Sequence, residues 1–283
     1  MLEWERNLVT TERGSFEFFI KGQGKPICIT HLYSAFNESG DNFADTFTSN
    51  NMVYLINLRE TGSSARAEQF HQLSMLETVM DLEAIRQSLG LKTWYFAGHS
   101  TGGMLGLVYG IYFPDSLAGL IVVGTAARDY TVSSSSIYHP DHPDFHRMQE
   151  LLELLKKSNL GAVQREALTK ERTKLSLYNP EEYEQLFSRQ IKKALSKERI
   201  EFFSRELAIF DLTSKLPGCQ PNLLILCGKY DVQCPWEFSK EINELVPGSR
   251  FITYDKSNHY PFLEQKQAFL RDIHHFLEGK PPY

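Results

Sequence analysis

Long apolar runs are missing from this sequence of 283 residues. No stretch approaches the roughly 18 apolar residues that a membrane-spanning helix needs. The N-terminal segment MLEWERNLVTTERG mixes charged with apolar residues, unlike the continuous apolar core of a signal peptide. We therefore expect a protein that has no membrane span and is located in the cytoplasm.

An excess of positive charge is also missing. Asp and Glu number 35 against 30 Lys and Arg, which gives a formal net charge of -5, and the basic residues are spread along the chain. Proteins that bind nucleic acids usually present a clustered basic face to the phosphates, so we expect no nucleic-acid partner. The 42% hydrophobic and 23% charged residues are ordinary for a globular protein and argue against extensive disorder.

Cysteine is scarce, and no metal-binding spacing stands out. The four cysteines lack the close pairs of zinc and redox motifs, so we expect reduced thiols. They are Cys28, Cys219, Cys227 and Cys234. One short run gathers ligand types, namely His139, Asp141, His142, Asp144 and His146. The prolines inside this run oppose a helix that would bring the side chains together, so we expect a solvated loop, no metal and no other cofactor.

What the sequence does contain is a regular alternation of short β-rich runs and helical patterns. The runs are SFEFFI, PICIT, MVYLINL, TWYFAG, LAGLIVVG, NLLILCG and SRFITYD. This alternation predicts an α/β protein with a mostly parallel sheet flanked by helices. Residues 73–90 have helical spacing and end at Gly90, as helices often do. We expect one apolar stripe of this helix to pack on the sheet: Leu73, Leu76, Val79, Met80, Leu82, Ile85 and Leu89.

The alternation is interrupted between about Arg128 and Leu216, where no strand-like run occurs. Three stretches in this block have a helical pattern: FHRMQELLELLKK, NPEEYEQLFSRQIKKALS and KERIEFFSRELAIF. Because strands of one sheet precede and follow the block, it is better interpreted as an insertion than as a separate domain. We expect residues 1–127 and 217–283 to form the core domain, and residues 128–216 to form a helical cap over it.

A Gly98-x-Ser100-x-Gly102 motif lies between the run TWYFAG and a following helical pattern. A serine in a tight turn from strand to helix needs glycine neighbours, because larger side chains would clash there. The strained turn exposes the serine hydroxyl. We therefore expect Ser100 to be a nucleophile.

A serine hydroxyl at neutral pH needs a neighbouring base, and the base needs an acid that fixes its tautomer. Two later strand-like runs supply candidates, because Asp231 follows NLLILCG and His259 follows SRFITYD. We interpret them as the acid and the base, in the chain order Ser, Asp, His. Asp129, after LAGLIVVG, is the alternative acid. We favour Asp231, because a glycine turn precedes it and places a short side chain at a strand end.

Together these motifs resemble the α/β-hydrolase family, within it the capped subgroup that includes proline iminopeptidases, esterases and carbon-carbon bond hydrolases. The resemblance covers essentially the whole chain. In that family a His-Gly turn follows the third strand and an Arg-Gly-x-Gly-x-Ser turn follows the fourth. Here they read His31-Leu32-Tyr33-Ser34 and Arg59-Glu60-Thr61-Gly62-Ser63-Ser64, so that Leu32 and Glu60 replace the usual glycines.

The resemblance also implies an oxyanion hole made of backbone N–H groups. By position, its donors would be the N–H of Tyr33 and the N–H of Thr101, the latter at the positive end of a helix. A substrate pocket should lie near the same strand ends. Its candidate lining residues are His31, Tyr130, Trp236 and Tyr260.

The default function is hydrolysis of a small carboxylic ester or amide through an acyl-enzyme, without a cofactor. The resemblance also allows cleavage of a carbon-carbon bond, or release of an N-terminal proline from a short peptide. The last activity would need carboxylates in the cap to hold the substrate amine, with candidates Glu150, Glu153, Glu181 and Glu182. A ligand receptor that uses the same pocket is the non-enzymatic alternative, and the complete triad argues against it. The sequence carries no signature of an oligomeric state.

Overall fold

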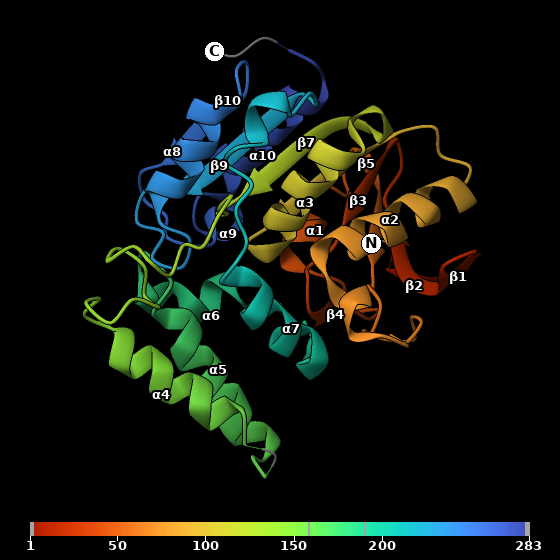
Figure 1. Cartoon of the computed structure of the whole chain (residues 1–283). Helices are drawn as coiled ribbons and strands as arrows, with labels where there is room; N and C mark the ends of the chain where they lie inside the picture. Colours follow the sequence, from red (N-terminus) through yellow and green to blue (C-terminus); the bar gives the residue numbers. More distant parts are fainter. Residues whose placement is uncertain (1–2, 158, 190, 281–283) are drawn as a thin grey trace.

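The computed structural model describes residues 3–157, 159–189 and 191–280, and its centre is an eight-stranded sheet (Figure 1). The strand order is β1-β2-β5-β3-β6-β7-β9-β10. β2 is antiparallel to both its neighbours, and the pairs from β5 to β10 are parallel. The bounds are β1 Glu5–Thr11, β2 Gly14–Lys21, β3 Lys25–Ile29, β5 Asn51–Ile56, β6 Trp94–His99, β7 Leu117–Val123, β9 Leu223–Gly228 and β10 Arg250–Tyr254. The predicted α/β class is thus confirmed.

All seven β-rich runs form strands, whereas β1 was not predicted. In β1 only Val9 is buried, and charged residues stand among the others, so the segment lacks the apolar content that marked the interior strands. It is an edge strand that pairs only with β2. Edge strands commonly carry such charges, which makes them hard to recognise from composition.

Helices cover both faces of the sheet, and two hydrophobic clusters lie between the layers. One cluster joins α2 (Met75–Ser88), α3 (Thr101–Tyr112) and α8 (Trp236–Leu245) to one face. The other joins α1 (Asn42–Asp45), α9 (Pro261–Glu264) and α10 (Lys266–Leu277) to the opposite face. Side chains of β7 alternate between them, since Leu120 and Val122 belong to the first cluster and Ile121 and Val123 to the second.

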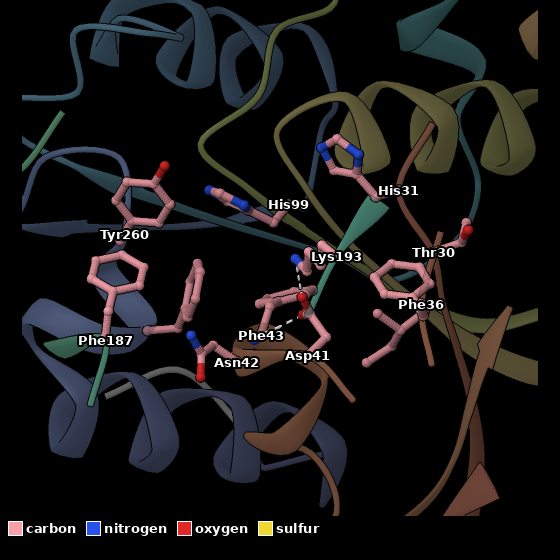
Figure 2. Close-up of a pocket in the computed structure, with 12 residues that line it drawn as sticks. Thr30, His31, Phe36, Asp41, Asn42, Phe43, His99, Phe187, Lys193 and Tyr260 are labelled. Carbon is pink, nitrogen blue, oxygen red and sulfur yellow. Dashed lines mark hydrogen bonds and ion pairs between the residues drawn. The ribbon is translucent and has the colours of Figure 1, made fainter. Parts of the chain in front are cut away.

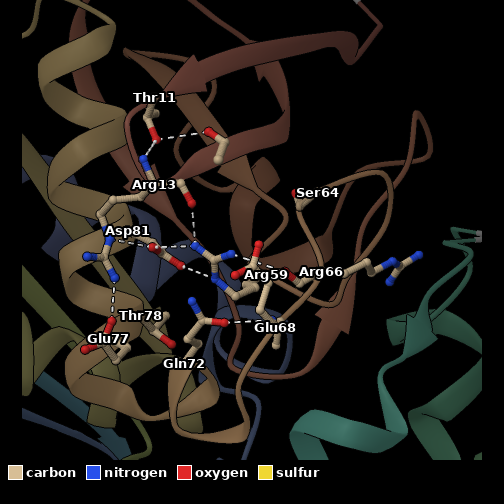
Figure 3. A network of polar contacts seen from close by, with 12 residues as sticks. Thr11, Arg13, Arg59, Ser64, Arg66, Glu68, Gln72, Glu77, Thr78 and Asp81 are labelled. Carbon is tan, nitrogen blue, oxygen red and sulfur yellow. Dashed lines mark hydrogen bonds and ion pairs between the residues drawn. The ribbon is translucent and has the colours of Figure 1, made fainter.

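The apolar stripe of α2 is narrower than the spacing indicated. Leu76 and Met80 are 41% and 38% exposed, so their predicted burial was wrong. A polar residue of α2, Asp81, takes part of the buried face instead. Its carboxylate accepts hydrogen bonds from Arg59 Nε at 3.0 Å and from Arg13 Nε at 2.7 Å (Figure 3). This ion-pair network ties α2 to the loops that follow β1 and β5.

Residues 128–216, called the inserted segment below, lie between β7 and β9 and contribute no described residue to the large sheet. Figure 1 shows their helices gathered on one side of the sheet, in green and cyan. These helices are α4 Phe145–Leu155, α5 Ala162–Lys174, α6 Tyr183–Leu186 and α7 Lys197–Leu207. A short strand, β8 (Ala194–Leu195), pairs with β4 (Ser34–Ala35) in a separate two-stranded sheet.

Two details of the inserted segment differ from the sequence prediction. The stretch 179–196, predicted as one helix, is helical only in the 3₁₀ turn Pro180–Glu182 and in α6. Its end is extended because it pairs with β4, and the Ser196 hydroxyl then caps α7 by accepting from Arg199 N–H at 3.2 Å. Helix α5 was missed because its surface is mostly polar. The remaining 3₁₀ turns are Phe70–Leu73, Pro114–Ser116 and Leu216–Gly218.

Candidate functional site

Ser100 occupies the sharp turn between β6 and α3. Its φ of 56° lies in the left-handed region, which is strained for a non-glycine residue. A Cβ at Gly98 would lie 2.1 Å from Gly102 O, and a Cβ at Gly102 would lie 2.5 Å from Thr30 O. The turn is fixed from β7, where Val123 O accepts from Ser100 N–H at 2.9 Å. The glycines are therefore required by close backbone contacts.

His259 and Asp231 form a buried pair at the same edge of the sheet. His259 Nδ1 lies 3.0 Å and 2.9 Å from the two carboxylate oxygens of Asp231, and their side chains are 2% and 0% exposed. Asp231 Oδ1 also accepts from the N–H groups of Gln233 and Cys234, each at 2.9 Å. With Nδ1–H donated to the carboxylate, the lone pair of the neutral imidazole is on Nε2, the nitrogen that a general base uses.

The end of β7 brings this pair next to the serine turn. A Cβ at Gly124 would lie 2.8 Å from Asp231 Oδ2 and 3.4 Å from His259 Nδ1. Gly124 directly follows Val123, which holds the Ser100 backbone. The carboxyl ends of parallel strands meet at one edge of a sheet, and here β6, β7, β9 and β10 deliver the serine, the glycine gap, the carboxylate and the imidazole.

The alternative acid lies elsewhere. Asp129 Oδ1 accepts from Thr131 N–H at 2.8 Å and from Thr131 Oγ1 at 2.7 Å, which closes a local turn. The structure therefore brings Asp231, rather than Asp129, to the imidazole of His259.

Two further histidines flank the serine turn. His99 Nε2 donates to the backbone oxygen of His259 at 2.7 Å. His31 lies within hydrogen-bond distance of Ser34 Oγ through Nδ1, at 3.0 Å, and of Thr101 Oγ1 through Nε2, at 3.2 Å. Burial lowers the pKa of His31 to about 3 and holds the pKa of His99 well below its ordinary value. Both rings are therefore neutral at neutral pH, and they position their neighbours without adding charge.

The two expected oxyanion donors, the N–H groups of Thr101 and Tyr33, are held in place by different parts of the structure. Thr101 is the first residue of α3, so its N–H is at the positive end of the helix dipole. The Leu32–Tyr33 peptide is held by the inserted segment, because Leu32 O accepts from Arg199 Nη1 at 3.0 Å and Tyr33 O accepts from Ser196 N–H at 2.9 Å. In a trans peptide C=O and N–H point in opposite directions, so the Tyr33 N–H points away from Arg199.

Arg199 was not anticipated from the sequence. It is 1% exposed, and it also donates from Nε to Arg59 O at 2.5 Å and from Nη2 to Thr78 Oγ1 at 3.1 Å. Burial lowers its pKa to about 10, so it still carries a charge at neutral pH. All of these acceptors are uncharged, and the residue anchors α7 to the core. No local pattern marks such an arginine, because its partners come from three distant loops and helices.

A cavity of about 80 Å³ lies beside the flanking histidines (Figure 2). Of the predicted pocket residues, His31 and Tyr260 line it, together with His99. Two residues not anticipated also line it, Asp41 and Lys193, and their side chains form an ion pair. Although burial raises the pKa of Asp41, the Lys193 charge and hydrogen bonds hold that pKa below its ordinary value.

The other two predicted pocket residues are not in this cavity. Trp236 lines a separate hollow beside Tyr230, and its Nε1 donates to Thr253 Oγ1 at 2.8 Å. Tyr130 is buried against Tyr138, with ring centroids 6.1 Å apart. The structure therefore separates Trp236 from His31 and Tyr260.

The carboxylates considered for binding an amine are all on the outer surface. Each of the four side chains is exposed: Glu150, Glu153, Glu181 and Glu182. Glu150 pairs with Arg147, and Glu153 with Lys156 at 2.6 Å. These four candidates are therefore solvated surface residues, and none of them lines the cavity of Figure 2.

The histidine-rich run 139–146 forms local turns. Within 139–146, His139 Nδ1 accepts from Asp141 N–H at 3.2 Å and His142 Nδ1 accepts from Asp144 N–H at 3.1 Å, as in local turns. No group of three or more His, Cys, Asp or Glu side chains suited to a metal occurs in the described part of the chain. In that same part, every helix is too short or too polar to cross a membrane.

The arrangement of strands and helices has counterparts among known proteins. A family model described as the alpha/beta hydrolase fold matches residues 35–266. The chain belongs to the α/β-hydrolase family. A solved structure of an alpha/beta fold family hydrolase from Bacillus anthracis is 38% identical to this α/β hydrolase, with a TM-score of 0.93, and the match covers 96% of this chain and 99% of that one.

Relatives of known name are more distant from this α/β hydrolase. A proline iminopeptidase from Lactobacillus acidophilus is 23% identical, over 77% of this chain and 77% of its own length. A pimeloyl-[acyl-carrier protein] methyl ester esterase from Vibrio cholerae is 20% identical, over 91% of this chain and 96% of its own. Their names span amide and ester chemistry, so the choice between these reactions depends on the residues of this chain.

Proposed function

We propose that this α/β hydrolase is a serine hydrolase that cleaves small carboxylic esters through an acyl-enzyme. The observation that carries the proposal is the buried His259–Asp231 pair at the sheet edge that also holds the strained Ser100 turn. An imidazole oriented by a carboxylate can take the serine proton, and a strained turn exposes the hydroxyl that attacks.

The reaction would proceed in two halves. Ser100 Oγ attacks the ester carbonyl while His259 Nε2 takes its proton, and the same nitrogen then protonates the departing alcohol. Water attacks the acyl-enzyme in the second half, again with His259 as base. Asp231 stabilises the imidazolium in both halves, and the N–H groups of Tyr33 and Thr101 stabilise the tetrahedral oxyanion.

The inserted segment would act as the cap of the site. Ser176, directly beyond α5, accepts from His259 N–H at 3.3 Å, and Lys193 lines the cavity beside His31. Both contacts place residues of the segment at the strand ends. We therefore assign residues 128–216 to a cap and residues 1–127 with 217–283 to the core.

Ester chemistry is favoured over release of N-terminal proline by the position of the acidic residues. An aminopeptidase needs a carboxylate that is free to hold the substrate amine, and the candidate cap carboxylates lie on the outer surface. Asp41 lines the cavity, but Lys193 already neutralises it.

Labelling with a fluorophosphonate probe tests the nucleophile, and Ser100→Ala is the control. We expect the wild-type protein to be labelled and the variant to stay unlabelled; an unlabelled wild-type protein would favour the receptor alternative. A panel of p-nitrophenyl esters, p-nitroanilides and prolyl p-nitroanilide then tests the reaction. Faster turnover of the prolyl substrate than of the esters would overturn ester chemistry in favour of aminopeptidase activity.

A further inference from the structure

One cationic side chain near the site has a buried nitrogen without a partner among the residues that the structure describes. Arg172 lies in the last turn of α5, and its Nε is buried without any hydrogen-bond partner. Other basic side chains of the α4–α5 pair do have partners: Arg147 pairs with Glu171, Lys170 pairs with Glu184, and Arg165 donates to Leu155 O at 2.9 Å. Arg172 as a whole is only partly buried, but buried polar atoms are normally hydrogen-bonded, so its unsatisfied Nε calls for a cause.

The end of α5 is docked on the proposed base. Ser176 O accepts from His259 N–H at 3.3 Å, and Ser176 Oγ accepts from Gln233 Nε2 at 2.9 Å. Arg172 precedes Ser176 by four residues, about one helical turn or roughly 5.4 Å along the axis. The guanidinium is therefore carried on the element that contacts the loop of His259.

The charge of Arg172 acts on four titratable side chains in the neighbourhood of the serine turn. Burial raises the pKa of Tyr33, Tyr138 and Tyr260, and the positive charge of Arg172 acts in the opposite direction on all three. Burial lowers the pKa of His31, and the same charge adds to that effect. His31 and Tyr260 both line the cavity of Figure 2. The unpaired charge therefore acts on the residues around the proposed pocket.

The carboxylates near the site already have partners. Asp41 is paired with Lys193, and Asp231 is held by His259 and two backbone N–H groups. Glu264 accepts from the N–H groups of Tyr178 at 2.6 Å and Asn258 at 2.9 Å, and from Ser257 Oγ at 2.8 Å. These carboxylates are therefore not available to Arg172, and an anion that pairs with it would come from a molecule that enters the site.

We propose that Arg172 binds a carboxylate of the substrate, so that the preferred esters are half-esters of dicarboxylic acids. The inference rests on the proposed ester hydrolysis. A guanidinium presents parallel N–H donors that match the two oxygens of a carboxylate. One guanidinium supplies one positive charge, which balances a carboxylate.

Kinetics with matched substrates test the proposal. The anionic substrate is mono-p-nitrophenyl glutarate, and the neutral one is p-nitrophenyl valerate, whose acyl chain has the same number of carbons. The measured quantity is the ratio of kcat/KM for the anionic over the neutral ester. In Arg172→Gln we expect this ratio to fall by about 10- to 100-fold, because a hydrogen-bonded charge is lost, with the change mainly in KM.

Two variants of the same helix sharpen the test. Lys170→Gln removes an equal charge from a side chain that pairs with Glu184, and its ratio should match that of the wild-type protein. Arg172→Lys keeps the charge but not the fork, so its ratio should fall between those of wild type and Arg172→Gln. Equal losses for both esters in Arg172→Gln, or a wild-type protein without preference for the anionic ester, would overturn the proposal.

A binding measurement separates this proposal from that of ester hydrolysis. Ser100→Ala protein is titrated calorimetrically with monomethyl glutarate, with and without the additional Arg172→Gln change. If binding depends on Arg172 but the wild-type protein hydrolyses no ester, the proposed reaction is wrong and the carboxylate site remains. Hydrolysis of neutral esters without Arg172-dependent binding would do the reverse. Thermal unfolding of Arg172→Gln is a further measurement. Because an unsatisfied buried nitrogen is costly, the Tm of this variant should equal or exceed that of the wild type.

Discussion

The sheet edge and the end of α5 treat buried polar groups in opposite ways. At the edge, His259, Asp231 and His99 are hydrogen-bonded to one another or to the backbone. At the end of α5, the buried Nε of Arg172 has no hydrogen-bond partner among the described residues. Groups that satisfy each other in the free protein are preorganised for a reaction, whereas an unsatisfied group is available to a ligand. Under the proposed function, the sheet edge therefore carries out the reaction, and the inserted segment selects the substrate.

Removal of the serine hydroxyl is the strongest test of the edge. Ser100→Ala should lower kcat by about 10⁶-fold, the size of loss known for deletion of a serine nucleophile. Its free energy of unfolding should stay near that of the wild type, because only one atom is removed. Burst and steady-state kinetics of a purified variant, with urea unfolding as the control, measure both quantities. Retained activity would remove the chemistry from the sheet edge.

The acid gives the next largest effect. Asp231→Asn should lower kcat by about 10⁴-fold, because an amide favours the wrong tautomer of His259. Asp129→Asn is the matched control, since Asp129 closes only the turn to Thr131, and its kcat should change little. If the two variants lost activity equally, the acid would have to be assigned to another residue.

Arg199 is the counterpart of Arg172 within the inserted segment, because each of its three side-chain nitrogens donates a hydrogen bond. Arg199→Met leaves three buried acceptors unsatisfied and should reduce the free energy of unfolding by about 3 kcal/mol. Arg205→Met, in the same helix but 67% exposed, should change it by less than about 1 kcal/mol. Urea unfolding compares the two variants, and similar losses of stability would show that the hydrogen bonds of Arg199 add little to the stability of the fold.

The same variant reports on the Leu32–Tyr33 peptide. In folded Arg199→Met, a less well placed Tyr33 N–H should lower kcat by about tenfold with little change in KM, since complete loss of an oxyanion donor costs about 10²- to 10³-fold. Arg199→Lys, which can still donate to Leu32 O, should recover part of kcat. An effect on KM without an effect on kcat would mean that Arg199 acts on substrate binding rather than on the position of the Tyr33 N–H.

The last prediction concerns pH. Burial lowers the pKa of His31 to about 3 in the folded protein, against an ordinary value of 6.5. Between these values the unfolded imidazole binds a proton that the folded one does not, so the free energy of unfolding falls as the pH drops from 6.5 towards 3. His31→Gln removes this contribution, and urea unfolding at several pH values should show a shallower fall. An unchanged slope would mean that His31 is already charged in the folded protein.

Local patterns explain what could be predicted from the sequence. The serine turn depends on Gly98 and Gly102, which are close along the chain, and the acid and base follow recognisable strands. Glu60 shows how a departure from a motif is accommodated: it keeps a φ of 64° at a position where glycine is usual, and its carboxylate accepts from Ala67 N–H at 2.6 Å.

What escaped prediction depends on contacts between distant segments. Lys193 meets Asp41 only after the inserted segment has docked, and β-pairing overrode the helical pattern at the next two residues, Ala194 and Leu195. Arg172 lies on a helix with a mostly polar surface, where nothing distinguishes it from its solvated neighbours Arg165 and Lys170. Only the fold shows which of these cations has a buried, unsatisfied nitrogen.

The hold of the inserted segment on the Leu32–Tyr33 peptide has a consequence for exchanging parts between related hydrolases. An insertion between two strands invites replacement with the corresponding segment of a relative, as a way to transplant specificity. Here such a chimera would lose the donors at Arg199 and Ser196 that hold two successive backbone carbonyls. Junctions placed at residues 128 and 193 would move α4, α5 and α6 with Arg172 while keeping residues 194–216 native. Substrate specificity would then be transferable without disturbing the loop that carries Tyr33, the proposed oxyanion donor.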